Sequence, residues 1–284
     1  EANNRGIEMN LEWRDKTESG FEYNVGVNMS TIRNRMTKLN GGTPISDGPF
    51  RNGSMYLTYT NEGMPIGAFW GYKTDGLIQT QEQLNAVKRA DFQPNAELGD
   101  VLFVDTNGDG KLDSSDRCMI GNPIPDIIYG INMGMAWKGF DLNLQFGGTI
   151  GNQIFNAMRY YTYFPNDITN KDRALMNYWT PNNTNTDIPR LTATDVNDND
   201  RFSDMYVENG TYFRLRNAQL GYTLPASLTQ RIKLQKVRFY VSGQNLFTIS
   251  SYSGMDPEVG QSSSLSRGID YGIYPQNISF TGGI

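Results

Sequence analysis

The sequence predicts an all-β fold made of antiparallel strands. Three observations indicate it: several segments alternate apolar and polar residues, turn sequences separate these segments, and the 284 residues include 30 glycines, 16 tyrosines and 14 phenylalanines. Alternation with a period of two gives a strand one apolar and one polar face. Such strands belong either to a β-sandwich or to a membrane barrel, whose apolar side faces lipid and whose polar side lines a wet lumen.

The clearest strands form a hairpin between residues 129 and 146. Apolar side chains occupy every second position from 129 to 137, and small or polar residues lie between them. Lys138-Gly139 then turns the chain, and the alternation returns from 140 to 146. The two strands therefore share one apolar face.

Five further segments predict strands by the same alternation. They are residues 7–14, 21–30, 211–223 and 236–247, and a last strand that begins at Asn277. The phase changes within the third of these segments, because Phe213 and Leu215 lie in one register and Leu220 and Tyr222 in the other. An extra residue in one strand causes such a change, so a β-bulge is predicted there.

Short and long connections alternate between the seven predicted strands. The short ones are residues 15–20, 138–139 and 224–234, and the long ones are 38–125, which has a predicted helix around 81–90, 151–209 and 248–275. Antiparallel strands place successive turns at opposite ends, so all the short turns fall at one end. Aromatic residues also gather there, namely Trp13, Phe21, Trp137, Phe140 and Tyr222. Outer-membrane barrels show both features, whereas the alternative is an extracellular β-sandwich with aromatic residues that cap its core.

Composition excludes several function classes. The net charge of −5 and pI near 4.9 give no support to nucleic-acid binding. Without histidine there is no Ser/His or Cys/His catalytic pair and no imidazole metal site, and no other catalytic constellation emerges, so we do not expect an enzyme. Cys118 is the single cysteine and is expected to be a small packed residue. The chain begins at Glu1 in mid-pattern without a signal peptide, which suggests a fragment or a processed product.

A candidate cation loop precedes the central hairpin. Oxygen ligands fall at the spacing of an EF-hand loop, with Asp105, Asn107 and Asp109 at positions 1, 3 and 5, Lys111 at the backbone-carbonyl position 7, Asp113 at 9 and Asp116 at 12. Hard oxygen ligands suit Ca²⁺. However, Asp116 reaches less far than the usual glutamate, and the loop follows a strand-like VLFV instead of a helix. The sequence therefore predicts a structural calcium loop, and the alternative is an Asp/Asn/Gly-rich turn without an ion.

The second long connection carries an aromatic run. Tyr160, Tyr161 and Tyr163, with Trp179 nearby, present rings that could contact a sugar or a peptide. Packing inside the long connection is the alternative. The acidic run from Asp195 to Asp204 is expected to be a solvated loop.

Four phrases together resemble one protein family. They are GMPIGAFWGYKTDGLIQTQEQ (63–83), GDVLFVDTNGDGKLDSSDRCMIGNPIPDIIYGINM (99–133), SDMYVENGTYFRLRNAQLGYTLP (203–225) and VRFYVSGQNLFTISSYSGMDPEV (237–259). Spread over nearly the whole chain, they are similar to the C-terminal part of SusC/RagA-type TonB-dependent outer-membrane transporters of Bacteroidota.

The resemblance implies a transmembrane β-barrel of 22 strands, of which this chain supplies the last seven. It also implies an N-terminal plug, energy from TonB and a SusD-like surface lipoprotein as a lid. The plug, the TonB box, the earlier strands and the usual aromatic end of the last strand are missing from this sequence, so we do not expect transport by this chain alone.

The function that follows is outer-membrane uptake of oligosaccharides or oligopeptides together with the lid, with the long connections on the extracellular side. The cargo class stays open. The rival is a soluble extracellular calcium-binding β-sandwich, as an adhesion or carbohydrate-binding module.

Overall fold

The computed structural model describes the chain except residues 52, 54, 165–168 and 261–262. Seven strands form one antiparallel sheet, called the long sheet here: β2 (Glu8–Lys16), β3 (Glu22–Thr31), β11 (Ile127–Trp137), β12 (Phe140–Ile150), β15 (Tyr212–Thr223), β16 (Arg238–Ser250) and β18 (Ser279–Gly283). Their order in the sheet is β18-β16-β15-β12-β11-β3-β2. All seven predicted strands are confirmed, and their order is that of the chain from edge to edge.

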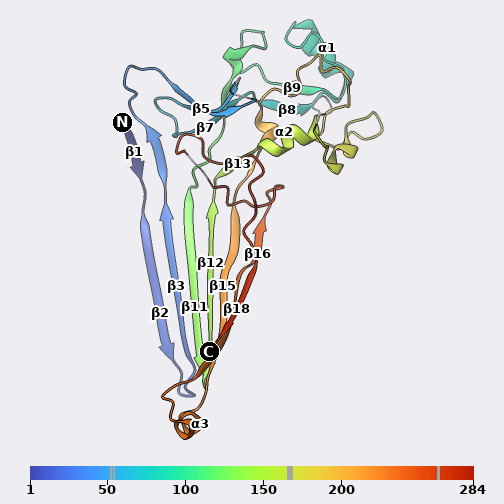
Figure 1. Cartoon of the computed structure of the whole chain (residues 1–284). Coiled ribbons are helices and arrows are strands. Elements are labelled where there is room, and N and C mark those ends of the chain that lie inside the picture. The colour runs from blue at the N-terminus through green and yellow to red at the C-terminus, as the bar shows by residue number, and fades with distance from the viewer. Residues whose placement is uncertain (52, 54, 165–168, 261–262) are drawn as a thin grey trace.

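The strands of the long sheet extend away from the long connections, which all lie at one end, and the short turns all lie at the other end (Figure 1). At the short-turn end, Lys138 and Gly139 have positive φ angles of 47° and 87°, and this conformation reverses the chain in two residues. The turn between β15 and β16 holds the helix α3 (Ala226–Thr229) and the 3₁₀ turn η4 (Gln230–Ile232). The predicted asymmetry of the connections is therefore confirmed.

One row of paired residues shows how the sequence sets the faces of the long sheet. Six neighbouring strands each contribute one residue to this row, and each residue is paired with the next across the sheet. The row is Leu11, Val27, Ile131, Phe146, Leu215 and Phe247. Because directly opposite residues point to the same side of a sheet, this row is apolar from end to end. The neighbouring row, which contains Asn28, Gly130 and Gly147, carries small or polar residues.

The predicted bulge is present. The partners of β15 in β12 step from Leu215 to Asn217, so Arg216 is the extra residue, and the pairing with β16 shifts at the same place. Phe213 and Leu215 before the bulge therefore share a face with Leu220 and Tyr222 after it.

The long connections fold into a head with sheets and cores of its own. A four-stranded sheet has the order β10-β7-β6-β5, from Cys118–Gly121, Ala68–Gly71, Met55–Thr60 and Ile45–Phe50. β8 (Thr74–Leu77) pairs with β9 (Val101–Phe103), and β13 (Gln153–Asn156) pairs with β14 (Val207–Asn209) and β17 (Ile269–Asp270). Below the head, β1 (Ala2–Arg5) pairs with β4 (Arg33–Met36). The sequence predicted long loops here, and most of these short strands were missed.

Helices of the head are short. α1 (Gln81–Arg89) confirms the predicted helix, and its capping box consists of Thr80 and Gln83. The others are α2 (Ala157–Tyr163) and the 3₁₀ turns η1 (Ser114–Asp116), η2 (Arg173–Asn177) and η3 (Asp204–Tyr206). No helix among the described residues has the length and apolar character needed to cross a membrane.

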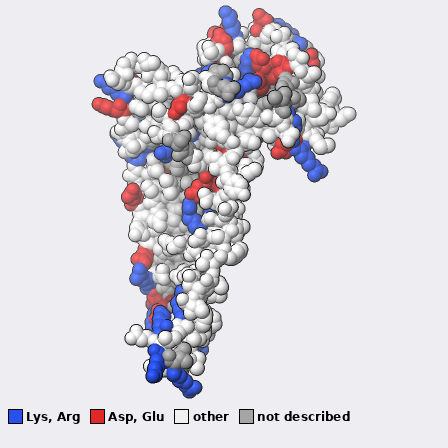
Figure 2. Space-filling model, in the orientation of Figure 1, with Lys and Arg blue, Asp and Glu red and all other residues white. Residues whose placement is uncertain are grey.

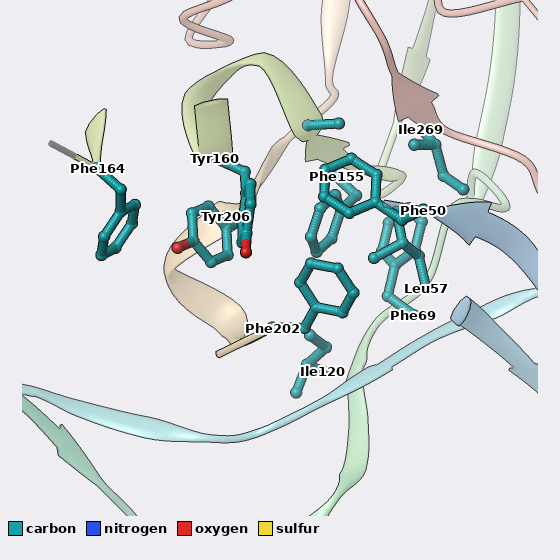
Figure 3. Packing of buried hydrophobic residues seen from close by; sticks show 11 residues of the cluster. Phe50, Leu57, Phe69, Ile120, Phe155, Tyr160, Phe164, Phe202, Tyr206 and Ile269 are labelled. Carbon is teal, nitrogen blue, oxygen red and sulfur yellow. The ribbon is translucent and has the colours of Figure 1, made fainter. Parts of the chain in front are cut away.

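Aromatic residues supply most of the main core of the head, called the head core here. It contains Phe50, Leu57, Phe69, Ile120, Phe155, Ala157, Tyr160, Phe164, Phe202, Tyr206 and Ile269. Figure 3 shows these side chains converging from strands and helical turns of all three long connections. The head is therefore held together by contacts between segments far apart in the sequence. Cys118 packs against this core and is half-buried, as expected of a small packed residue.

Candidate functional site

The apolar face of the long sheet is exposed in this chain. Trp13 retains 64%, Leu11 59%, Val241 62% and Phe280 78% of their accessible surface. Soluble proteins rarely expose contiguous apolar surface of this extent, because apolar contact with water is unfavourable. This apolar face suits a hydrocarbon surrounding. Figure 2 shows charged side chains on the head, along the edge that carries β1 and β2, part-way down the sheet and around the short turns, with uncharged surface between these groups.

The opposite face carries amides, glycines and ion pairs. A Cβ added to Gly134 would lie 2.2 Å from the Asn24 amide oxygen, so the asparagine side chain lies directly over this glycine. At the short-turn end, Arg238 of β16 reaches over Gly221 of β15 to Asp141 of β12, with nitrogen to oxygen distances of 2.9 and 2.5 Å. A polar face of this kind suits a water-filled lumen.

A buried arginine fastens the last long connection to this polar face. Arg214 of β15 is only 2% exposed and donates to Asp256 at 2.5 Å, to Glu258 at 3.0 Å and to the Thr248 hydroxyl at 2.9 Å. Arg216, the extra residue of the bulge, donates to the same Glu258 at 3.1 Å. Sequence reasoning missed this network, although the phase change beside Arg216 marked its place.

The acidic loop of residues 105–116 has the turns of a cation loop. Asp105 accepts hydrogen bonds from the backbone N–H groups of Gly108 at 2.6 Å and Gly110 at 2.9 Å, and both glycines have positive φ angles. The Gly110 N–H above all lowers the pKa of Asp105. The Ser115 hydroxyl and backbone likewise lower the pKa of Asp113. Both carboxylates are therefore ionised at neutral pH.

The five side chains among the six predicted ligand positions accept hydrogen bonds from backbone N–H groups of the loop. Asp116 is fully buried and accepts from the Thr106 and Asp113 N–H groups, each at 3.0 Å. Asp109 accepts from the Lys111 N–H at 2.9 Å and from the Asn107 amide at 3.1 Å. Within the described part of the chain, no three or more Asp, Glu, His or Cys side chains are grouped closely enough to hold a metal ion. The donor types suit calcium, but they are turned toward N–H groups in this arrangement.

The aromatic residues predicted to meet a ligand lie in two separate places. Tyr160 is 3% exposed in the head core and donates to Asp200 at 2.9 Å, and burial, with the nearby Asp200, raises its pKa. Tyr161 and Tyr163 are half-buried against the same core. Trp179 is 6% exposed in a second cluster with Leu77, Phe92, Val101 and Phe103, where its indole donates to Gln79 at 2.8 Å. These positions are those of packing residues, and the structure does not bring Trp179 to the three tyrosines.

The acidic run between Asp195 and Asp204 is more than a solvated loop. Asp204 accepts from the Thr74 hydroxyl at 2.6 Å, and Asp200 accepts from Tyr160. Burial raises the pKa of Asp195. The expectation of a solvated loop was wrong, because these carboxylates join segments of the head.

Comparison with known proteins shows relatives along the whole chain. It is 36% identical over 296 aligned residues to the TonB-dependent receptor P3 of Formosa agariphila, and 27% identical over 282 aligned residues to the TonB-dependent receptor SusC of Bacteroides thetaiotaomicron. These alignments cover 100% and 99% of this chain but 28% and 26% of the relatives. The chain thus spans little more than a quarter of their length. No family model matches the sequence.

Solved structures show the same fold. The RagAB peptide transporter matches with a TM-score of 0.74 at 23% identity, covering 99% of this chain and 28% of that one. The RagAB peptide importer in its closed-closed state gives a TM-score of 0.73 at 24% identity, with 99% and 29% covered. The long sheet and the head together therefore share the fold of part of these RagAB chains.

Proposed function

We propose that this chain, which is homologous over its full length to the SusC/RagA-type TonB-dependent receptors, forms part of the barrel wall and extracellular head of such a transporter. Receptors of this type are non-enzymatic proteins of the outer membrane. The observation that carries the proposal is the long sheet, which has an exposed apolar face and a polar opposite face. In a barrel the first faces lipid and the second faces the lumen.

The long sheet would be the last seven strands of a barrel of 22. Its edge strands, β2 and β18, leave backbone groups without a neighbouring strand within this sheet. Exposed strand edges are unfavourable, and inside a membrane they must be paired. The remainder of the barrel, with its plug, would supply these partners.

The long connections would then face outward and meet the lid and the cargo. We infer a SusD-like lipoprotein over the head, TonB acting through the plug, and uptake of an oligopeptide or an oligosaccharide. Support for a peptide comes from the RagAB peptide transporter, whose fold this chain shares. An oligosaccharide is the alternative cargo that the family resemblance implies.

Calcium is proposed as a structural ion of the head. The ligands would be Asp105, Asn107, Asp109, Asp113 and Asp116 with the Lys111 carbonyl, and the ion would hold the acidic loop in one conformation. The Asn107 amide N–H donates to Asp109 at 3.1 Å and holds these two ligand positions side by side. The aromatic residues Tyr160, Tyr161, Tyr163 and Trp179 are more readily explained as packing residues than as cargo contacts, since two of them are almost fully buried.

The soluble β-sandwich is the second candidate, and the structure offers it little support. A sandwich buries the apolar face of its sheet against a second sheet. Here apolar side chains of the long sheet remain exposed on β2, β11, β12, β15, β16 and β18.

Cysteine labelling of the full-length receptor tests the facing directly. In a Cys118→Ser background, Ile131→Cys on the apolar face should react with a lipid-soluble maleimide, and Asn132→Cys, its neighbour in β11, with a water-soluble one. Fractionation provides the second measurement, because the receptor should require detergent for release from the outer membrane. Equal labelling of both cysteines by the water-soluble reagent, or release as a folded monomer without detergent, would reject the barrel.

A further inference from the structure

Three arginines lie on one face of the β1–β4 ribbon. Arg5 is directly opposite Arg33, and Arg35 is directly opposite Asn3, so the three side chains share one side of the ribbon. All three residues are exposed. None of them forms an ion pair with any carboxylate in the described part of the chain. Like charges directly opposite each other are destabilising, and this face has no carboxylate to offset the facing charges of Arg5 and Arg33.

The register connects this face to the apolar face of the long sheet. Met9 pairs with Met29 in β2 and β3, and Arg5 pairs with Arg33 in β1 and β4, so the register is the same on both sides of the break between the two sheets. At the break, the Thr31 N–H donates to the Ile7 carbonyl at 2.9 Å and keeps the strands together. Residues an even number apart in a strand point to the same side. The arginines therefore continue the apolar face toward the head, beyond its last apolar row.

A cavity of about 860 Å³ lies beside the ribbon. Its walls include Arg5, Arg33 and Arg35 from the ribbon, and Asn122, Ile124 and Asp126 from the segment that precedes β11. The Ile32 N–H donates to the Asp126 carbonyl at 2.9 Å. Glu62 also lines the cavity, as does Asp126, but neither is within ion-pair distance of an arginine. The cavity therefore offers room and a net positive lining.

We propose that this three-arginine face binds the phosphate groups of a lipid headgroup in the outer leaflet. The inference rests on the proposed function, because only a barrel in a membrane places lipid beside the apolar face. Its position fits, since a residue just beyond the apolar band lies at the depth of the headgroups (Figure 1). The chemistry also fits, because the planar guanidinium group binds phosphate oxygens with two parallel hydrogen bonds and stays charged at any physiological pH.

The test uses the full-length receptor purified from outer membranes in a mild detergent. In the triple variant Arg5→Gln, Arg33→Gln and Arg35→Gln, native mass spectrometry and phosphorus analysis should show at least about threefold less bound lipid phosphate. A matched triple variant, Arg231→Gln, Lys233→Gln and Lys236→Gln, removes three positive charges from the short-turn end and should leave this lipid in place. Unchanged lipid phosphate in the first variant, or an equal loss in the second, would overturn the proposal.

Two further measurements separate the outcomes. Inorganic phosphate at millimolar concentration should not displace the lipid, and full displacement would assign the site to a free anion instead. Should the triple variant fail to fold, judged by its heat-modifiable mobility on gels, Arg33→Lys serves in its place. Lysine keeps the charge but cannot make two parallel hydrogen bonds to a phosphate, so this variant should retain about half of the lipid phosphate. Full retention would count against the site. Absence of the unmodified receptor from the outer membrane would contradict the proposed function itself. Normal insertion of the triple variant with unchanged lipid phosphate would contradict this inference alone.

Discussion

The long sheet and the head use the same apolar residue types in opposite ways. In the long sheet, Leu11, Val241 and Phe280 point outward and keep more than half of their accessible surface, whereas in the head Leu57, Phe69 and Phe155 keep 2% or less. Water drives apolar side chains together in the head. In a membrane that driving force is absent, and strands persist because their backbone groups must pair with each other. The two regions should therefore respond to different substitutions.

The largest expected effect comes from an aromatic residue of the head core. Phe155 is 1% exposed, and its ring centroid lies 5.9 Å from those of Phe69 and Phe202 (Figure 3). Phe155→Ala should destabilise the head by about 3–5 kcal/mol through lost burial and a cavity. Limited proteolysis of the purified receptor should then cut the head at lower temperature, while its amount in the outer membrane stays normal.

Met176 provides the matched control for the head. It lies in η2 and is 78% exposed. Met176→Ala should change the stability of the head by no more than about 0.5 kcal/mol. If Phe155→Ala lowered membrane insertion as strongly as head stability, the two regions would not be independent.

A smaller effect is expected from charge on the apolar face of the long sheet. Leu144 lies near the middle of β12, between Met133 and Ala218 in the neighbouring strands. Leu144→Arg should cost about 2–4 kcal/mol in lipid, and Gln145→Arg on the lumen side should cost much less. Guanidinium titration of the receptor refolded in lipid vesicles measures both, and equal costs would reject the assignment of the two faces.

Much of the long sheet could be predicted from the sequence because its signals are local. Alternation over about ten residues marks a strand whatever its partner is. The change of phase between Leu215 and Leu220 predicted a bulge, which the structure places at Arg216. The head could not be predicted in the same way. Its strands are short, and β13 depends on β14 and β17, which lie far along the chain. Few local residues specify such strands.

The candidate sites also differ in whether their signals are local in the sequence. The acidic loop was recognised because its carboxylates and glycines recur at fixed short spacing. The N–H groups from which its carboxylates accept hydrogen bonds, such as that of Thr106 for Asp116, become visible only in the structure. The Arg214 network was missed because Asp256 follows 42 residues later. The arginine pair in the β1–β4 ribbon likewise needs a partner strand to become visible, since Arg5 and Arg33 are unremarkable in the sequence.

A local change in the head should have a modest effect. The Thr80 hydroxyl accepts from the Gln83 N–H at 3.2 Å, and the Gln83 side chain accepts from the Thr80 N–H at 3.1 Å. Thr80→Ala should destabilise α1 by about 1 kcal/mol, and Thr80→Ser should have almost no effect. Hydrogen exchange of residues 81–90 should become about fivefold faster in the alanine variant only. Faster exchange across the head core as well would show that α1 supports the whole head.

The smallest effect on the long sheet is expected from the acidic loop. Asp105→Asn with Asp109→Asn removes two charges that calcium requires and keeps side chains of nearly the same size. Without calcium, this variant and the unmodified receptor should insert and refold equally. With millimolar calcium, only the unmodified receptor should bind the ion, measured by elemental analysis, and only its acidic loop should become more resistant to protease.

Dependence on pH sharpens the same test. The Gly110 N–H lowers the pKa of Asp105, and the Ser115 hydroxyl lowers that of Asp113. A lowered pKa means that the stabilising hydrogen bonds are fully present above the ordinary carboxyl value of 3.8 and are lost only as the pH falls through the lower value. Calcium binding should therefore stay constant between about pH 5 and pH 8, where these carboxylates remain ionised. A steep loss of calcium binding near pH 6 would assign the ion to other groups. If the receptor binds calcium but its protease resistance does not change, the ion has no structural role in the acidic loop.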